Sequence, residues 1–472
     1  MSTTSPQALH LIDKPLSEED LANQIDNLSD LQGNILKGHG RDHSAHIFLK
    51  FKPGRIAMVR AWLHGPLKAR ITSAQKQIDD AAAFKATQKD GGVFQIFVVS
   101  AAGYAYLGKD TAAFGDASFR AGAQASIDPL NDPKIAAWEP GFADEIHAML
   151  LIADVQQAKV AFMAREVAIE VSAFADVLVS QPGDQQKNER GNGIEHFGYV
   201  DGRSQPLMLE RDLAGESDGR TLWNPMVGPA QVLIHDPFGG ADSSGSYFVF
   251  RKLEEKVRAF KTQEQVLATA MGLTGDAREL AGALVIGRFE DGTPVALSDE
   301  PLIEDSLPPN DAAVPNDFDY RHDTDGSRCP FMSHIRKSNP RGSGPGGLVD
   351  EMTRHMARRG ITYGERAADT FEDISKMPVD GVGLLFMAYQ RSIVDQFEFI
   401  QTLWVDNAGF PGAGSGMDPV IGQHANPAPT AQVWPKVWGQ AGATVSFDFR
   451  DFVVMKGGEY FFSPSLSGIA AL

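Results

Sequence analysis

The order of predicted strands and helices constrains the fold of this chain more than any other feature of its sequence. Alternating or strongly apolar runs are typical of strands, and apolar residues at helical spacing are typical of helices. The first predicted segments are a strand at 46–51, a helix at 56–69, strands at 93–100 and 147–154, a helix at 156–167 and a strand at 168–172. Strand, helix, strand, strand, helix, strand is the order of a ferredoxin-like unit, which predicts an antiparallel sheet covered by helices.

A similar order of elements returns in the second half, without a residue-level repeat. Its segments are a strand at 245–252, a helix at 254–271, strands at 283–287 and 383–390, a helix at 393–404 and a strand at 460–462. The stretch 301–347, rich in Pro, Asp and Gly, predicts a long insertion, and such insertions in compact domains are usually functional. Residues 1–30 are polar and acidic and predict a partly ordered arm. Because 472 residues are many for one core, we expect two domains, 1–215 and 216–472.

The formal net charge of −18 argues against general binding to nucleic acids and to anionic membranes, because both are negatively charged. This charge is compatible with neutral or cationic organic substrates. No apolar run is long enough to span a bilayer, and the N-terminus lacks the basic and apolar regions of a signal peptide. The single cysteine, Cys329, excludes an intrachain disulfide and fits a reducing compartment. We therefore expect a cytoplasmic protein in which Cys329 is a small buried residue.

A histidine followed by a dense cationic run lies inside the insertion, in the stretch Cys329-Pro-Phe-Met-Ser-His334-Ile-Arg336-Lys337-Ser-Asn-Pro-Arg341. A neutral imidazole is a good ligand for iron or zinc, and arginine pairs with carboxylates in a two-pronged fork. Haem requires both, because it needs an axial ligand and counter-charges for two propionates. The alternative is an ordinary surface loop with a solvated charge run, which spacing alone does not exclude.

This stretch resembles the proximal-histidine motif of dye-decolorising peroxidases. The segment 198–202 (Gly-Tyr-Val-Asp-Gly) resembles the distal Gly-x-x-Asp-Gly signature of that family, and 358–364 (Arg-Arg-Gly-Ile-Thr-Tyr-Gly) resembles its segment with the distal arginine. The segments 31–38 and 458–465 also resemble family landmarks. The matches occur in the family's order over most of the chain and resemble the longer subgroup that includes fungal members. The resemblance implies an α+β fold of two ferredoxin-like halves, antiparallel sheets with peripheral helices, in the dimeric α+β barrel-like superfamily.

The resemblance also implies a haem-dependent peroxidase that reduces hydrogen peroxide and oxidises dyes and phenols by one-electron steps, with haem b as the cofactor. His334 would be the axial iron ligand, and Asp201 would move the peroxide proton. Arg358 would stabilise the developing negative charge. Arg359 stays open as the distal arginine, because the doublet leaves the register ambiguous by one residue. A small or bulky aromatic reductant would be the second substrate, and a homo-oligomer is compatible with the resemblance.

The same resemblance assigns further contacts of the cofactor. Asp418 is the first choice for the carboxylate that accepts the second N–H of His334, and Asp395 is the reserve. The expected partners of the haem are Arg341 and Arg336 for the propionates, and Leu384 and Phe386 for an apolar distal wall.

Simpler alternatives stand beside these assignments. Asp201 could be a turn aspartate, and the arginine doublet could end a solvated helix. His196 invites a zinc site with Asp201 and His334, but the spacing matches no compact ligand pattern. A haem-binding or haem-processing protein on the same fold is the alternative function, although a carrier needs neither Asp201 nor the doublet. The aromatic residues considered as electron carriers to bulky donors are Tyr389, Trp404, Trp434 and Trp438.

Overall fold

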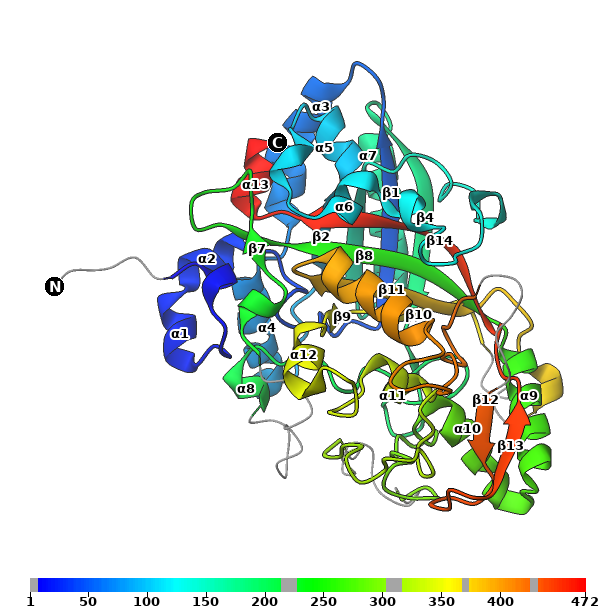
Figure 1. Ribbon diagram of the computed structural model, residues 1–472. Coiled ribbons are helices and arrows are strands. Elements are labelled where there is room, and N and C mark those ends of the chain that lie inside the picture. Colours follow the sequence, from blue (N-terminus) through cyan, green and yellow to red (C-terminus); the bar gives the residue numbers. More distant parts are fainter. Residues whose placement is uncertain (1–6, 214–226, 303–315, 367–372, 425–431) are drawn as a thin grey trace.

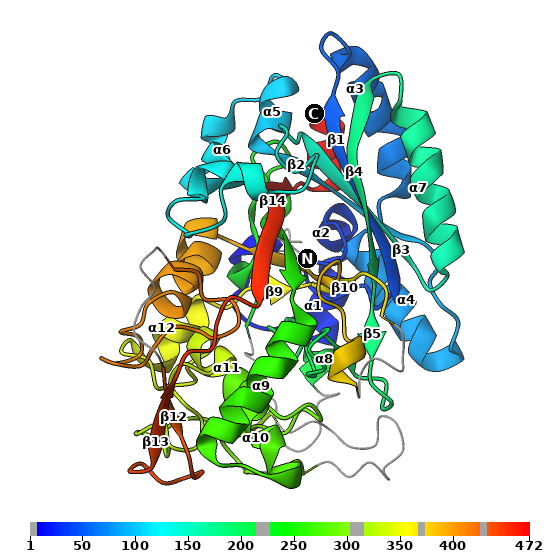
Figure 2. The ribbon, with the colours of Figure 1, turned by 90° about the vertical axis from the view of Figure 1, so that its right-hand side faces the viewer.

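An antiparallel sheet runs through the molecule in the computed structural model, which describes residues 7–213, 227–302, 316–366, 373–424 and 432–472 (Figure 1, Figure 2). The ten strands of this sheet are β1 (His43–Phe51), β2 (Phe94–Ser100), β3 (Ala148–Asp154), β4 (Ala175–Asp184), β7 (Ile234–His235), β8 (Ser244–Glu255), β9 (Ala357–Arg358), β10 (Ile361–Tyr363), β11 (Gly383–Gln390) and β14 (Val453–Ser463). Within the described residues they follow the order β10-β11-β8-β14-β2-β3-β1-β4, with β7 paired to β8 and β9 to β11.

The first four strands have the order and the connections of a ferredoxin-like unit. β1 leads through α3 (Ile56–Trp62) and α4 (Ala74–Thr87) to β2, and α7 (Gln157–Val171) leads from β3 to β4. The chain between β2 and β3 carries α5 (Ala101–Tyr106) and α6 (Ala117–Ala121). In the sheet the order is β4-β1-β3-β2, and each of these pairs is antiparallel.

The second half repeats this plan. Between β8 and β14 the chain forms α9 (Val257–Met271), α10 (Glu279–Ile286), α11 (His334–Ser338), α12 (Gly347–Thr353), β9, β10, β11 and two π-helical segments, Ile393–Glu398 and Ile400–Val405. The order β14-β8-β11, with β9 and β10 beside β11, again corresponds to a ferredoxin-like sheet. β14 pairs with β2 through Phe461 opposite Ser100 and Phe462 opposite Val99, so the two halves share one sheet. The expected pair of ferredoxin-like halves is confirmed.

Both faces of the sheet are covered by apolar packing, because side chains alternate along each strand. Phe48, Phe250 and Phe461 belong to one core cluster, which also receives buried residues of α4 and of the N-terminal helices α1 (Glu18–Asn23) and α2 (Ile25–Asp30). Tyr247 and Phe462 belong to the cluster on the opposite face, with residues of α3, α7 and α13 (Leu466–Ala471). A third cluster joins α9 and α10 to the small sheet of β12 (Gln432–Pro435) and β13 (Thr444–Phe447) at the lower end of Figure 1.

Two predicted strands are helical in the structure. Residues 168–172 belong largely to the end of α7, and the strand begins later, at Ala175. Residues 283–286 belong to α10, whose residues from Leu280 to Ile286 are all buried, and Gly287 caps its end. A short run that is buried on every side lacks the polar face that distinguishes a helix from a strand by period. The predicted helix at 56–69 also ends early as an α-helix, at Trp62, and continues as a π-turn that contains Pro66.

The N-terminal residues are ordered more than the sequence predicts. A capping box at Ser17 and Asp20 begins α1, and Leu16, Leu21 and Leu28 are buried. The polar stretch after residue 180 begins as strand, since β4 continues to Asp184 before the short pair β5 (Gln186–Lys187) and β6 (Gly193–Ile194). The short helix α8 (Glu210–Leu213) ends where the described part of this region ends. The expected domain boundary at 215/216 lies outside the described residues and stays a prediction.

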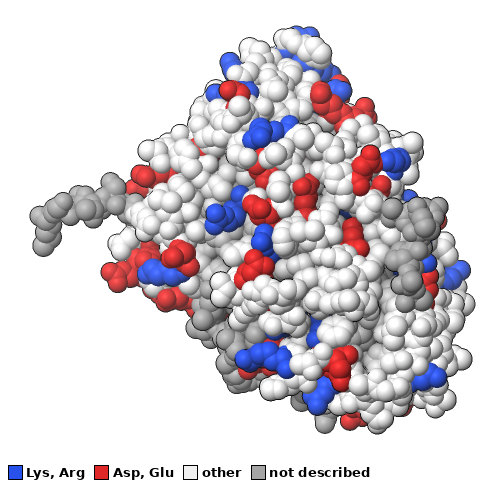
Figure 3. Space-filling view, viewed as in Figure 1, with Lys and Arg blue, Asp and Glu red and all other residues white. Residues whose placement is uncertain are grey.

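Charged side chains of both signs are interspersed on the face of the molecule shown in Figure 3. None of the helices in the described part of the chain has the length and apolar character needed to cross a membrane.

Candidate functional site

A cavity beside β8 and β11 brings together the histidine, the aspartate and the first arginine singled out in the sequence. It has two adjoining lobes of about 150 and 240 Å³, and both lobes are lined by Asp201, His334, Arg358 and Leu384. These residues come from the loop after β6, the start of α11, β9 and β11. Segments that are far apart in the sequence therefore meet at one site.

His334 presents one ring nitrogen to the cavity, because the other is held by a buried carboxylate. Its Nδ1 lies 2.8 Å from Oδ2 of Asp418, while Oδ1 of Asp418 accepts the backbone N–H groups of Val420 and Ile421 at 2.8 and 2.9 Å. Burial lowers the pKa of His334, but the charge and hydrogen bond of Asp418 outweigh burial and leave it above its ordinary value. Nε2 has no hydrogen-bond partner among the described residues, so a neutral His334 can offer its lone pair to a metal.

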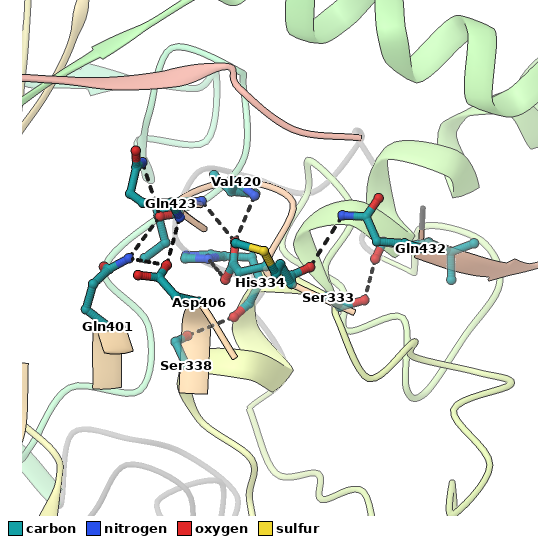
Figure 4. Close-up of polar contacts among 12 residues, drawn as sticks. Ser333, His334, Ser338, Gln401, Asp406, Val420, Gln423 and Gln432 are labelled. Carbon is teal, nitrogen blue, oxygen red and sulfur yellow. Dashed lines mark hydrogen bonds and ion pairs between the residues drawn. The ribbon is translucent and has the colours of Figure 1, made fainter. Parts of the chain in front are cut away.

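The loop that carries Asp418 is fixed by further contacts around His334 (Figure 4). The backbone N–H of Asp418 donates to Val405, and the N–H of Gln423 donates to the carboxylate of Asp406 at 2.7 Å. Ser338 closes the turn of α11 by donating to the carbonyl of His334 at 2.9 Å. The reserve candidate Asp395 is exposed and accepts a hydrogen bond from Ser392, so it does not contact His334.

Asp201 follows a loop that folds around the carboxyl groups of Glu195, which is half-buried, and Glu255, which is buried. Glu195 accepts the N–H groups of Phe197 and Tyr199 at 2.5 and 3.0 Å, and Glu255 of β8 accepts that of His196 at 3.0 Å. Burial raises the pKa of Glu195 to about 8, and the hydrogen bonds from the loop offset only part of this effect. Both glutamates line the cavity, yet the motifs did not identify them.

The two glycines of the distal motif have backbone conformations that other residues rarely adopt. Gly198 has φ of 105° and Gly202 has φ of 79°. Asp201 between them is exposed toward the cavity, and its carboxylate has no hydrogen-bond partner in the described part of the chain. A carboxylate placed in this way is available as a proton acceptor.

The two arginines of the doublet point to opposite sides of the chain: Arg358 is the last residue of β9, and Arg359 follows it. Arg358 lines both lobes, and its guanidinium donates to the carbonyl of Arg203 at 2.7 Å. Arg359 points away from the cavity and donates to the carbonyls of Asn34 and Ile35 at 2.7 and 2.8 Å. Adjacent residues of a strand face opposite sides, so only one of the two can line this cavity.

Cationic groups at one end of the cavity suit the carboxylates of a ligand. Arg341 is buried there and donates to Ser204 and to the Asn316 side chain at 2.6 and 2.7 Å. Burial lowers the pKa of Arg341 to about 10, and burial together with Arg341 lowers that of the neighbouring Arg288 to about 9. Two buried guanidinium groups beside each other favour an anionic ligand at this end of the cavity.

The expectation for Arg336 is not supported by its position. Arg336 is fully buried outside the cavity lining, where its guanidinium binds the carboxylate of Asp323 at 2.7 Å and stacks on Tyr320. Its donors therefore stabilise the insertion around the motif. Cys329 is buried as expected, and burial raises the pKa of its thiol to about 11, which makes a reactive thiolate unfavourable.

Apolar side chains form the remaining walls. Leu384 and Phe386 project from the same face of β11, and both line the larger lobe together with Leu253, Ile421 and Val453. His355 also borders this lobe, and burial together with the charges of Arg358 and Arg341 lowers its pKa to about 4. Sequence reasoning missed His355, since nothing in the motifs distinguishes it.

The aromatic residues considered as electron carriers do not line the cavity. Tyr389, Trp404 and Trp434 are buried. Trp438 is half-buried and packs against Arg328. The tyrosine that does line the cavity is Tyr199, whose hydroxyl donates to Glu264 at 2.5 Å.

Haem fits this combination of groups. The imidazole nitrogen of His334 that has no partner among the described residues suits the iron. The buried guanidinium groups suit the propionates, and the apolar wall suits the porphyrin. The hydrogen bond between His334 and Asp418 is already formed in the structure.

Comparisons with known proteins agree with this site. Residues 30–184 match the model of the DyP dimeric alpha+beta barrel domain. The chain is 43% identical over 458 residues to the multifunctional dye peroxidase DyP2 of Amycolatopsis sp., which covers 94% of this chain and 96% of that protein. It is 32% identical to the dye-decolorizing peroxidase msp1 of Mycetinis scorodonius, over 94% of this chain and 87% of that protein.

Solved structures show the same relationship. The crystal structure of a DyP-type peroxidase of Anabaena sp. superposes with a TM-score of 0.87 at 39% identity, covering 97% of both chains. The structure of DyP2 from Amycolatopsis sp. superposes with a TM-score of 0.90 at 40% identity, covering 98% of this chain and all of the other.

Proposed function

Because this chain belongs to the dye-decolorising peroxidase family, whose members depend on haem, we propose that the cavity around His334 binds haem b and reduces hydrogen peroxide there. Organic donors such as dyes and phenols would supply the electrons, one at a time. The observation that carries this assignment is the placement of His334, Asp201 and Arg358 around one cavity.

When bound, haem supplies an iron centre that peroxide oxidises by two electrons and that organic donors reduce again in two one-electron steps. His334 would hold the iron through Nε2. Asp418 fixes the ring by accepting the proton on Nδ1 and raises its basicity, as carboxylate partners of ligating histidines do. Arg341 and Arg288 would bind the propionates, and Leu384 and Phe386 would pack against the porphyrin.

The chain's distal residues would handle the proton and the charge. Asp201 would accept the proton of the near peroxide oxygen on its carboxylate and deliver it to the far oxygen, which then leaves as water. The guanidinium of Arg358 would hold fixed donors toward the negative charge that develops as the O–O bond breaks. A protein that only carries or processes haem needs neither group, so these two residues favour catalysis.

Rapid mixing with peroxide tests these roles. Asp201→Asn keeps the size of the side chain and removes the proton acceptor, while Arg358→Leu removes the charge. Each should slow the spectral change that follows peroxide addition by about 10²–10³ without loss of haem, since this is the usual cost of one preorganised group. The matched control is Arg359→Leu, which removes an equal charge one residue away and should react like the parent protein.

The roles of Arg358 and Arg359 would be reversed if Arg359→Leu were slow and Arg358→Leu reacted normally. Unchanged rates in both Asp201→Asn and Arg358→Leu would refute the proposed mechanism. The cytoplasmic location and a homo-oligomeric state stay predictions.

A further inference from the structure

A second pocket of about 470 Å³ lies on the outer side of the distal residues. Gly202 and Arg358 border both this pocket and the cavity around His334, so a single layer of residues separates the two. Its other walls come from the segment 34–41, from Lys85 of α4 and from 205–207. The proposed reaction leaves this pocket without a role.

Positive charge predominates in this pocket, in contrast to the net charge of −18 of the whole chain. Five cationic residues line it against one carboxylate, Asp212; the cations are Lys37, Arg41, Lys85, Arg358 and Arg359. Asp212 is already paired with Lys37 at 2.7 Å. A surplus of cations in a concave surface raises the local concentration of anions.

The remaining cations have no carboxylate partner within the described residues. Arg41 donates to the carbonyls of Gly92 and His39, and Arg359 donates to carbonyls as well. Lys85 is exposed and makes no side-chain hydrogen bond in the described part of the chain. Burial, followed by the charges of His46, Arg41 and Arg359, lowers the pKa of His39 to about 3, so this imidazole is neutral.

Apolar side chains complete the pocket. Leu36, Pro206, Leu207 and Ile361 line it beside the cations. Its volume lies within the range of pockets that hold organic ligands. Apolar walls next to unpaired cations are complementary to a ring that carries an anionic group, because the ring is desolvated while the charge is paired.

We propose that this pocket binds an aromatic electron donor that carries a carboxylate or sulfonate group, next to the distal side of the haem cavity. The inference rests on the proposed peroxidase function and names a substrate class for it. Two donor molecules each lose one electron and one phenolic proton, and one hydrogen peroxide becomes two water molecules. Because the chain as a whole carries a net charge of −18, a cationic pocket favours binding of such donors here over other parts of the molecule.

A matched pair of phenols tests the proposal in the haem-loaded enzyme. The pair is 3-(4-hydroxyphenyl)propanoate and its amide, which share the oxidised ring and differ in charge. At low ionic strength the parent enzyme should oxidise the propanoate with the higher kcat/KM, and added salt should remove the difference. Lys85→Glu, and Lys85→Glu combined with Arg41→Gln, should lower kcat/KM for the propanoate by about tenfold and leave the amide unchanged.

The control is Lys436→Glu, an equal charge change at an exposed position after β12, which should affect neither donor. Lys85 is exposed on α4, so its replacement does not disturb the core even if Arg41→Gln weakens the loop. Equal kcat/KM for the two donors in the parent and in both variants would overturn the inference while the peroxidase function stands. Oxidation of neither donor by the parent enzyme with peroxide would overturn both.

Discussion

Replacement of Asp418 by asparagine is the change whose consequence follows most directly from the geometry. In the structure Oδ2 of Asp418 accepts the proton on Nδ1 of His334, and Oδ1 accepts two backbone N–H groups. An asparagine has one acceptor oxygen and one NH₂ group, so it cannot accept in both directions. Either orientation of the amide therefore loses either the hydrogen bond accepted from His334 or the two accepted from the backbone.

If the amide oxygen stays on the backbone side, the NH₂ group faces His334, and the ring must carry its proton on Nε2. The lone pair offered to the cavity is then lost. If the amide is turned, the NH₂ group faces the N–H groups of Val420 and Ile421, and buried donors are left without an acceptor. An unsatisfied buried group costs about 1–3 kcal/mol, which corresponds to roughly 5- to 150-fold in haem affinity.

Titration of the haem-free protein with haem, followed by absorbance, measures this effect. Asp418→Asn should bind haem about 10- to 100-fold more weakly than the parent, in line with other carboxylate partners of ligating histidines. Asp395→Asn is the control, because Asp395 is exposed and does not line the cavity, and this variant should bind haem normally. Equal affinities of the parent and Asp418→Asn, or a loss in Asp395→Asn alone, would refute the role given to Asp418.

Two further predictions concern stability. Burial lowers the pKa of His46 to about 4, so its imidazole stays neutral in the folded protein, while in the unfolded chain it takes up a proton below about pH 6.5. The free energy of unfolding should therefore fall by about 3 kcal/mol from this residue as the pH drops from 6.5 toward 4. Urea unfolding of His46→Leu should show a smaller decrease in the free energy of unfolding over this pH range than the parent protein does. Phe48 is fully buried between the rings of Phe142 and Phe250, so Phe48→Ala should lower the free energy of unfolding by about 3–5 kcal/mol, and a loss below 1 kcal/mol would contradict this packing.

The sequence indicated several core strands of the large sheet but mistook one buried helix for a strand. β1, β2, β3 and β11 were predicted close to their observed bounds, because their apolar runs are short and end at polar or turn residues. α10 was mistaken for a strand, since seven consecutive buried residues show no polar face. Uniform burial is a property of the neighbours in space, which the local sequence does not contain.

The site shows the same division between local and long-range information. Asp201, His334 and Arg358 were found through motifs, and the structure brings all three to the cavity. Asp418 stands 84 residues after His334 in the sequence, so its contact could be named only as one of two candidates. Arg336 and Arg341 belong to the same cationic run, but Asp323 binds the first, and no local pattern predicts that pairing.

The absorption spectrum of the purified protein, compared with that of His334→Ala, is the most direct test of haem binding through His334. The parent protein should bind haem and show an intense Soret band typical of a histidine-ligated ferric haem. The His334→Ala variant should lose stable haem binding or show a shifted spectrum, because the axial bond through Nε2 is gone. A parent protein that fails to bind added haem, or a His334→Ala variant with the haem content and spectrum of the parent, would show that His334 does not hold a haem iron.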